Sequence, residues 1–228
     1  MRLRALMLSV VLAVAPGPGG ACAGPKEVRD ATSATIQAFV RGKGMEVLTF
    51  VGYSGAGYES PALLTSQAAS ILDGKDPART LINIGATAEG IGAVYALAKR
   101  RGFTTIGIVS SLARANPVAY APCVDHVFVV KDPTWGGKLP GQVELSPTSR
   151  ALVENSTAVV AIGGGEVARD EVLAARQAGK LVLFIPADMN HAKARRKARQ
   201  QGKPPPRDFR GALHQSLNVD PLLPTALP

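Results

Sequence analysis

The residues best suited to chemistry are glycines that follow apolar runs at three places in the chain. They lie in GYSGAGYESP (residues 52–61), GATAEGIG (85–92) and GGGEVARDE (163–171). Glycine lacks a Cβ, so its backbone can adopt a positive φ and a phosphate can approach its N–H group closely. A helix that begins after such a corner adds unsatisfied N–H donors and the positive end of its dipole. These three glycine corners predict a phosphate or nucleotide pocket, with the alternative that glycine only lets the chain turn.

The binding candidates are the corner residues nearest the ends of the expected strands. None of the corners is a strict G-x-G-x-x-G, and none is a P-loop, because no Gly-Lys-Ser/Thr follows. Thr87 could touch a ribose or a phosphate, or it could cap the following helix. We predict a pocket formed by Gly55, Gly85, Thr87, Gly90, Gly163, Gly164 and Gly165.

Aromatic and acidic side chains near the corners form a second group of candidates. Tyr53 and Tyr58 could stack on a base, or they could pack at the end of a strand. Trp135, the only tryptophan, could cover a flat ring or pack its own loop onto the domain. Glu166 would suit the dipole of the helix that starts there, but it would repel a phosphate.

The elements that must position these residues are strands alternating with helices. Runs such as EVLTFVGY (46–53), TTIGIVSS (104–111) and KLVLFIPA (180–187) are typical of strands buried on both faces. No Asn-Gly or Asp-Gly turn joins neighbouring strands, so the order predicts right-handed βαβ crossovers. The fold class is therefore α/β, a Rossmann-like doubly wound and mostly parallel sheet with helices on both faces. Ligands bind such sheets at the carboxyl ends of the strands, near a topological switch point.

Length and composition fit one folded domain with flanking segments. The chain has 228 residues, of which 46% are hydrophobic and 19% charged, and this excludes a disordered or fibrous class. We expect a leader at 1–23, a leading helix within 24–45, the Rossmann-like domain at 46–190, and a basic helix with a Pro-rich tail at 191–228.

The first residues have the layout of a secretory signal peptide. Arg2 and Arg4 precede an apolar run at 5–15, and small residues offer a cleavage site after Ala23. The apolar run is too short for a permanent membrane span. A lipid anchor at Cys22 is one alternative, and a cytosolic protein whose start is assigned too far upstream is another. We expect a periplasmic or secreted protein.

Cleavage after Ala23 has consequences for charge and for cysteine chemistry. The net charge of +9 would fall to +7, nine minus the two removed arginines, and Cys123 would remain as a single cysteine. The expectation is therefore that no intramolecular disulfide forms. A Cys123–His126 nucleophile pair is disfavoured, because alternation along a strand points the two side chains to opposite faces. The sequence has no Cys/His metal spacing, and we predict neither a metal nor a cofactor.

Most of the net charge lies near the C-terminus. Residues 190–210 carry eight Lys or Arg against one Asp. A third functional hypothesis follows, in which a basic periplasmic protein binds anionic partners through this helix. The basic residues are not interleaved with aromatics, so nucleic acid is not a predicted partner.

Two segments carry a resemblance to a known family. LINIGATAEGIGAVYALAKRRGFTTIGIVSS (81–111) and AVVAIGGGEVARDEVLAARQAGKLVLFIP (158–186) resemble segments of the SLOG superfamily. That superfamily includes LOG-type phosphoribohydrolases, proteins called "possible lysine decarboxylase" and molybdenum-cofactor carrier proteins. The resemblance covers roughly residues 47–186. It implies a Rossmann-like fold, a nucleotide or phosphorylated small molecule at the glycine corners, and a homodimer.

The resemblance also implies roles for particular residues. The family's paired glycines fall on Gly164 and Gly165, and its glutamate falls on Glu171, which would stabilise a ribosyl cation or orient water. An exposed mid-helix position is the alternative for Glu171. Arg150 is the nearest match to the arginine that assists catalysis in hydrolase members, and Val167-Ala168 replaces the family's Gly-Thr. The resemblance thus implies either cleavage of an N-glycosidic bond or a non-catalytic ligand-binding or sensing protein.

Overall fold

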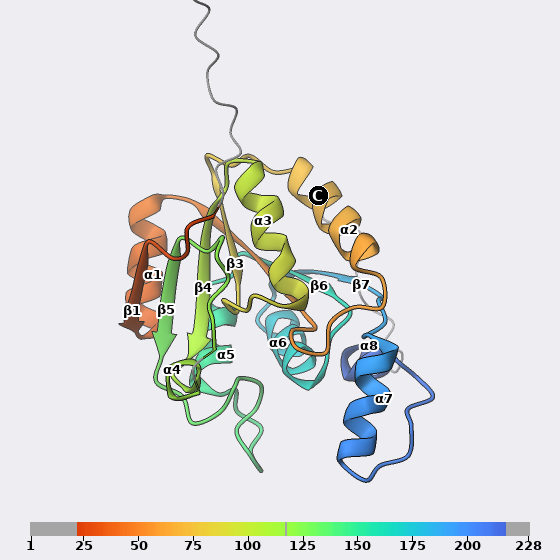
Figure 1. Ribbon diagram of the computed structural model, residues 1–228. Coiled ribbons are helices and arrows are strands. Elements are labelled where there is room, and N and C mark those ends of the chain that lie inside the picture. The colour runs from red at the N-terminus through yellow and green to blue at the C-terminus, as the bar shows by residue number, and fades with distance from the viewer. Residues whose placement is uncertain (1–21, 117, 218–228) are drawn as a thin grey trace, which may run out of the picture.

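A single seven-stranded sheet organises the protein. The computed structural model describes residues 22–116 and 118–217, so the rest of the expected leader and the last part of the expected tail lie outside the described residues. All strand pairings are parallel, in the order β1-β5-β4-β3-β2-β6-β7 (Figure 1). The predicted fold class is confirmed. The strands are β1 Glu27–Ala31, β2 Glu46–Gly52, β3 Thr80–Ile84, β4 Thr104–Ser110, β5 His126–Val130, β6 Ala158–Ile162 and β7 Leu181–Ile185.

Helices cover both faces of the sheet (Figure 1). On one face α2 and α3 pack over Phe50 and Ile84; on the other α1, α5 and α6 pack over Val51, Leu81 and neighbouring side chains. The central strands β2 to β6 are largely buried on both faces because helices pack on both sides of the sheet. The helices are α1 Ser33–Lys43, α2 Pro61–Asp73, α3 Ala93–Arg100 after the 3-10 turn η1 Gly90–Gly92, α4 Leu112–Ala115, α5 Pro147–Glu154, α6 Glu166–Gln177, α7 His191–Gln200 and α8 Gly211–Leu217.

Local sequence signals explain where several helices begin. The Ser146 side chain accepts a hydrogen bond from the Ser149 N–H, and Pro147 occupies the first turn of α5, as the Ser-Pro pair predicts. Ser60 and Pro61 start α2 in the same way. A proline tolerates the first turn because its missing N–H would have no partner there.

The predicted leading helix is wrong at its start. Residues Glu27–Ala31 form β1, which pairs with β5, and the helix α1 begins only at Ser33. Thr32 ends the strand and caps the helix, because its side chain accepts the N–H of Thr35. The strand lies at the edge of the sheet with three of its residues exposed, so a buried apolar run does not mark it in the sequence.

The expectation of an unpaired Cys123 is also wrong. Cys22 and Cys123 form a disulfide that closes a separation of 101 residues. The segment around Cys22 is bound to the start of β5, since the Gly24 N–H donates to the Pro122 carbonyl at 2.9 Å. Lys26 Nζ lies 3.1 Å from the Asp125 carboxylate. The segment from Cys22 to Lys26 is therefore attached to the folded domain, and cleavage after Ala23 would remove the Cys22–Cys123 disulfide.

Membrane-spanning helices and metal-binding clusters are the two features considered next. Within residues 22–116 and 118–217, no helix is long and apolar enough to cross a membrane. The same residues hold no group of three or more His, Cys, Asp or Glu arranged for a metal ion.

The strand order reverses beside β2. Successive strands β3, β4 and β5 step outward on one side of β2, whereas β6 and β7 lie on its other side. The loops that leave β2 and β6 diverge at this switch point, and a crevice opens at the carboxyl edge. The candidate site lies in this region.

Candidate functional site

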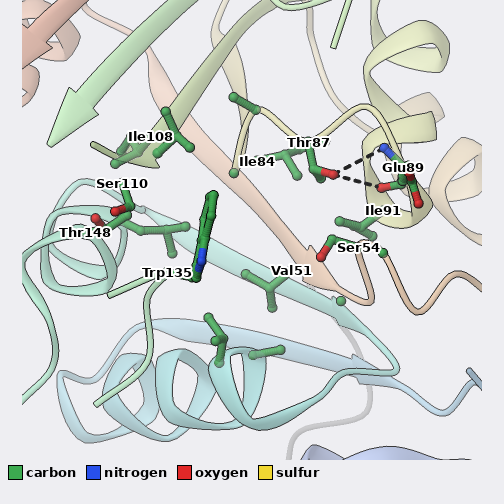
Figure 2. A pocket seen from close by; sticks show the side chains of 18 of the residues that line it. Val51, Ser54, Ile84, Thr87, Glu89, Ile91, Ile108, Ser110, Trp135 and Thr148 are labelled. Atoms are coloured by element: carbon green, nitrogen blue, oxygen red, sulfur yellow. Dashed lines mark hydrogen bonds between the residues drawn. The ribbon is translucent and has the colours of Figure 1, made fainter. Parts of the chain in front are cut away.

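A cavity of about 470 Å³ opens at the carboxyl edge of the sheet. It is lined by the ends of β2, β3 and β4, by the first two turns of α5 and α6, and by the loop that carries Trp135. Its walls are mostly aliphatic, with Ile84, Ile108 and Leu152 among them. Figure 2 shows Trp135, Thr148 and Ser110 grouped on one side of the cavity, and Thr87, Glu89 and Ser54 grouped on the other.

Glu171 is the buried carboxyl group of this cavity. The residue is 6% exposed and lines the cavity, so the alternative of an exposed mid-helix glutamate is wrong. Its Oε1 accepts a hydrogen bond of 2.6 Å from Ser149 Oγ. Burial raises the pKa of Glu171 to about 7, although the Ser149 hydrogen bond opposes the shift and the nearby Asp170 charge adds to it. A carboxyl group with this pKa can give or take a proton near neutral pH.

Ser149 connects Glu171 to the Trp135 loop. Its Oγ accepts the Gly137 N–H at 2.7 Å while it donates to Glu171. The Lys138 N–H donates to Asp170 Oδ2 at 3.0 Å, which adds a second attachment to α6. Sequence reasoning missed Ser149, because a serine in the first turn of a helix indicates only a helix start.

Trp135 stands at the rim of the cavity. It is 52% exposed, and its indole points toward the cavity interior (Figure 2). A side chain that only packed its loop onto the domain would bury more of its ring. The arrangement favours the prediction that the ring covers a flat ligand.

The first two glycine corners leave open backbone at the cavity. A Cβ at Gly55 would meet nothing within 4 Å, and one at Gly85 would meet only the Ile108 carbonyl at 4.0 Å. Thr87 lines the cavity, and its Oγ1 accepts the Glu89 N–H at 3.2 Å in the turn before η1. Thr87 does not cap the helix, because the N-cap of η1 is Glu89 and no side chain caps that turn. Gly90 has a structural role instead, since its φ is 58° and a Cβ there would lie 2.1 Å from the Tyr53 carbonyl.

The third glycine corner lies outside the cavity, and other residues of the protein cover Gly164 there. Gly163, Gly164 and Gly165 are absent from the residues that line the cavity. A Cβ on Gly164 would lie 2.7 Å from the Ala168 Cβ and 3.2 Å from Leu213 of α8. The Leu213 N–H donates to the Gly164 carbonyl at 3.2 Å. Helix α8 therefore occupies the space above this corner, where the sequence predicted a phosphate.

Substitution of the two adjacent glycines should separate a packing role from a binding role. Gly164→Ala is expected to lower the free energy of unfolding by at least about 2 kcal/mol, because the side chain would meet Ala168 and Leu213 at a φ of 147°. Gly165→Ala is the matched control, since a Cβ there meets nothing within 4 Å. As a poorer N-cap it should lose less than about 1 kcal/mol. Urea denaturation compares them, and equal losses would contradict the assignment.

Several other predicted residues lie outside the cavity. Arg150 is exposed and its Nη2 lies 3.4 Å from the Leu145 carbonyl, so it does not meet Glu171 in the cavity. Tyr53 and Tyr58 are buried, and their hydroxyls donate to the carbonyls of Arg210 and Ile162. The tyrosines therefore pack and brace the loops at this edge instead of stacking on a ligand.

One buried polar atom in the cavity wall lacks an ordinary hydrogen-bond partner. Thr148 is 5% exposed, and its Oγ1 is buried without a hydrogen-bond partner of ordinary geometry. The side chain lies close enough to Asp132 to help lower the pKa of that carboxyl, against the opposing effect of burial. A buried hydroxyl in this state is a ready donor or acceptor for a bound molecule.

Comparisons with known proteins show a likeness of fold. No family model matches the chain, and no curated protein sequence matches it. Similar solved structures include TM1055, a structural genomics target, with 23% identity over 61% of this chain and 73% of that chain and a TM-score of 0.43. Another is the Moco carrier protein from Chlamydomonas reinhardtii, with 19% identity, 62% and 76% coverage and a TM-score of 0.46.

A third similar structure is DNA processing protein A (DprA) from Streptococcus pneumoniae. It shares 14% identity over 78% of this chain and 62% of that chain, with a TM-score of 0.44. The molybdenum-cofactor carriers are one of the groups that the sequence resembles. At these identities and TM-scores the similarity concerns the fold and assigns no activity.

Proposed function

We propose that the cavity at the carboxyl edge binds a nucleotide or phosphorylated nucleoside. The observation that carries this proposal is a cavity of about 470 Å³ that combines aliphatic walls, a tryptophan at its rim, a buried carboxyl group and open backbone at two glycine corners. That volume and composition are typical of small-molecule sites. The position next to a topological switch point is typical of ligand sites in open α/β sheets.

The two ends of the cavity suit different parts of such a ligand. A planar base fits the end near Trp135, where Ile108 supplies an apolar wall and Thr148 a buried hydroxyl without a hydrogen-bond partner of ordinary geometry. The opposite end offers the open backbone of the corner at Gly55, which suits a phosphate, and Gly85 lies between the two ends, beside Ile108, where a ribose would fit. Glu171 lies at the base end, since a Cβ on Gly136 would be 3.9 Å from its Oε1.

A catalytic form of the proposal uses Glu171. Its carboxylate would take a proton from a water molecule whose oxygen bonds to the anomeric carbon as the N-glycosidic bond breaks. The protonated Glu171 would then give that proton to the departing base, and the sugar would keep the hydroxyl. A pKa of about 7 places Glu171 in the range where such a transfer is effective. The non-catalytic alternative retains binding and lacks base release.

Tryptophan fluorescence tests binding directly. Because Trp135 is the only tryptophan and lies at the rim, titration with AMP should change its emission saturably. Gly85→Leu is expected to abolish the change without unfolding the protein, since the new side chain extends into open space in the cavity. Thermal unfolding checks that variant. A titration without saturation, or one that Gly85→Leu leaves intact, would contradict the proposal.

Base release separates the enzyme from the binding protein. An enzyme should release adenine from AMP, as measured by chromatography, and Glu171→Gln should reduce that rate by at least about a hundredfold. Binding of AMP by wild-type protein without release would support a sensing or carrier role.

We also propose that the chain is exported and that its leader is removed upstream of Cys22. The basic start and the apolar run support export, and the Cys22–Cys123 disulfide is a bond that persists in oxidising compartments. A sulfur atom in a disulfide cannot also carry a lipid, so the same bond argues against the lipid-anchor alternative. N-terminal sequencing of the exported protein tests this proposal, and a first residue after Cys22 would contradict it.

A further inference from the structure

The cavity walls leave the charge of a phosphate unbalanced. Among the described residues that line the cavity, none is a lysine or an arginine, and two are acidic, Glu89 and Glu171. Open backbone N–H groups can contact a phosphate, but they carry no full positive charge. A cation from an element outside the cavity walls would therefore strengthen the binding of an anionic group.

Lys193 supplies a cation at the rim. This residue lies in the first turn of α7, and its Nζ donates to the Gly55 carbonyl at 3.2 Å. The same Nζ is 3.5 Å from Glu89 Oε2. Gly55 and Glu89 both line the cavity, and Figure 2 shows Glu89 and Ser54, the residue before Gly55, at the end away from Trp135.

The position of Lys193 is fixed by the start of α7. Asn190 caps the helix by accepting the Lys193 N–H, and the Asn190 N–H donates to the Gly57 carbonyl at 3.2 Å. The His191 N–H donates to Glu59 Oε2 at 2.8 Å. The beginning of this basic helix is thus attached to the first glycine corner, which holds the ammonium group beside Gly55 and Glu89.

We infer that Lys193 is the residue that selects an anionic group on the ligand. The inference rests on the proposed function and names the recognition element of that same site. In the free protein, Lys193 pairs with Glu89 over a distance typical of a weak, exposed ion pair. A bound phosphate, with a larger charge than one carboxylate, would replace Glu89 as the partner of the ammonium group.

The other cations of α7 have a different placement. Arg195 stacks over the Phe209 ring, with its guanidinium 5.3 Å from the ring centroid. Lys197 is exposed one helical turn beyond Lys193. Lys197 therefore provides a matched control, with the same charge on the same helix but farther along it from the rim.

The experiment compares AMP with adenosine in three proteins. Affinities are measured by Trp135 fluorescence and by calorimetry for wild type, Lys193→Gln and Lys197→Gln. We expect Lys193→Gln to weaken AMP binding by at least about tenfold and to leave adenosine binding unchanged. Lys197→Gln should change either affinity by less than about twofold. Lys193→Arg should retain part of the preference for AMP.

The outcomes distinguish the assignment of Lys193 from the proposed function. If wild type binds AMP and Lys193→Gln binds it equally well, the assignment of Lys193 is overturned and the proposed function stands. Equal losses in the Lys193 and Lys197 variants would also overturn it, since the general field of the basic helix would then explain the effect. If wild type binds neither AMP nor adenosine, the proposed function and the assignment both fail.

Discussion

Glu171→Gln is expected to remove about 3 kcal/mol from the change in the free energy of unfolding between about pH 4 and about pH 8. The folded protein raises the pKa of Glu171 from 4.5 to about 7, chiefly through burial. Folding therefore favours the protonated form, and this contribution is fully present below the unfolded-state pKa. It is lost as the pH rises through about 7, where the folded protein must hold a buried negative charge.

Urea denaturation at a series of pH values measures this effect. The free energy of unfolding of wild type should fall relative to that of Glu171→Gln as the pH rises, because glutamine does not ionise. Glu166→Gln is the matched control, since Glu166 is exposed in the first turn of the same helix. Parallel curves for wild type and Glu171→Gln would show that the carboxyl group titrates as it does in the unfolded chain.

Loss of the disulfide is expected to lower the free energy of unfolding by about 4 kcal/mol. The Cys22–Cys123 bond closes a separation of 101 residues, and cross-links that close long loops restrict the unfolded chain most. The variant is Cys22→Ser with Cys123→Ser, so that no free thiol remains. Its unfolding midpoint should be well below that of oxidised wild type.

Chemical reduction provides the control for the cysteine variant. A thiol reductant should lower the stability of wild type to that of the double variant and leave the double variant unchanged. Peptide mapping without reduction should recover a Cys22 peptide joined to a Cys123 peptide. Equal stability of the oxidised wild type and the double variant would contradict the predicted contribution.

The parallel sheet and many helix boundaries were predictable because their signals are local. Buried β-branched runs mark β2, β4 and β6, and the Ser146-Pro147 pair marks the start of α5. Each signal depends on residues within one element, and burial on both faces leaves a continuous apolar run. The edge strand β1 lacks that pattern because half of its surroundings are solvent, and its pairing with β5 decides its conformation.

The candidate site was predicted only in part. The corners at Gly55 and Gly85 open onto the cavity as expected, since their place at strand ends follows from the fold. The corner at Gly164 does not, because Leu213, 49 residues later in the chain, packs over it. Whether a glycine receives a ligand or a neighbouring side chain depends on which distant segment reaches it.

The sequence by itself determined the class of fold, the strand ends where glycines gather, and the position of Glu171 near one of them. Tertiary structure alone decided that Ser149 meets Glu171, that Cys22 meets Cys123, and that Lys193 reaches the rim at Gly55. The physical reason is the range of the interactions. Backbone propensity and hydrophobic periodicity act within a few residues, whereas burial, pKa and charge pairing depend on groups that only the folded chain brings together.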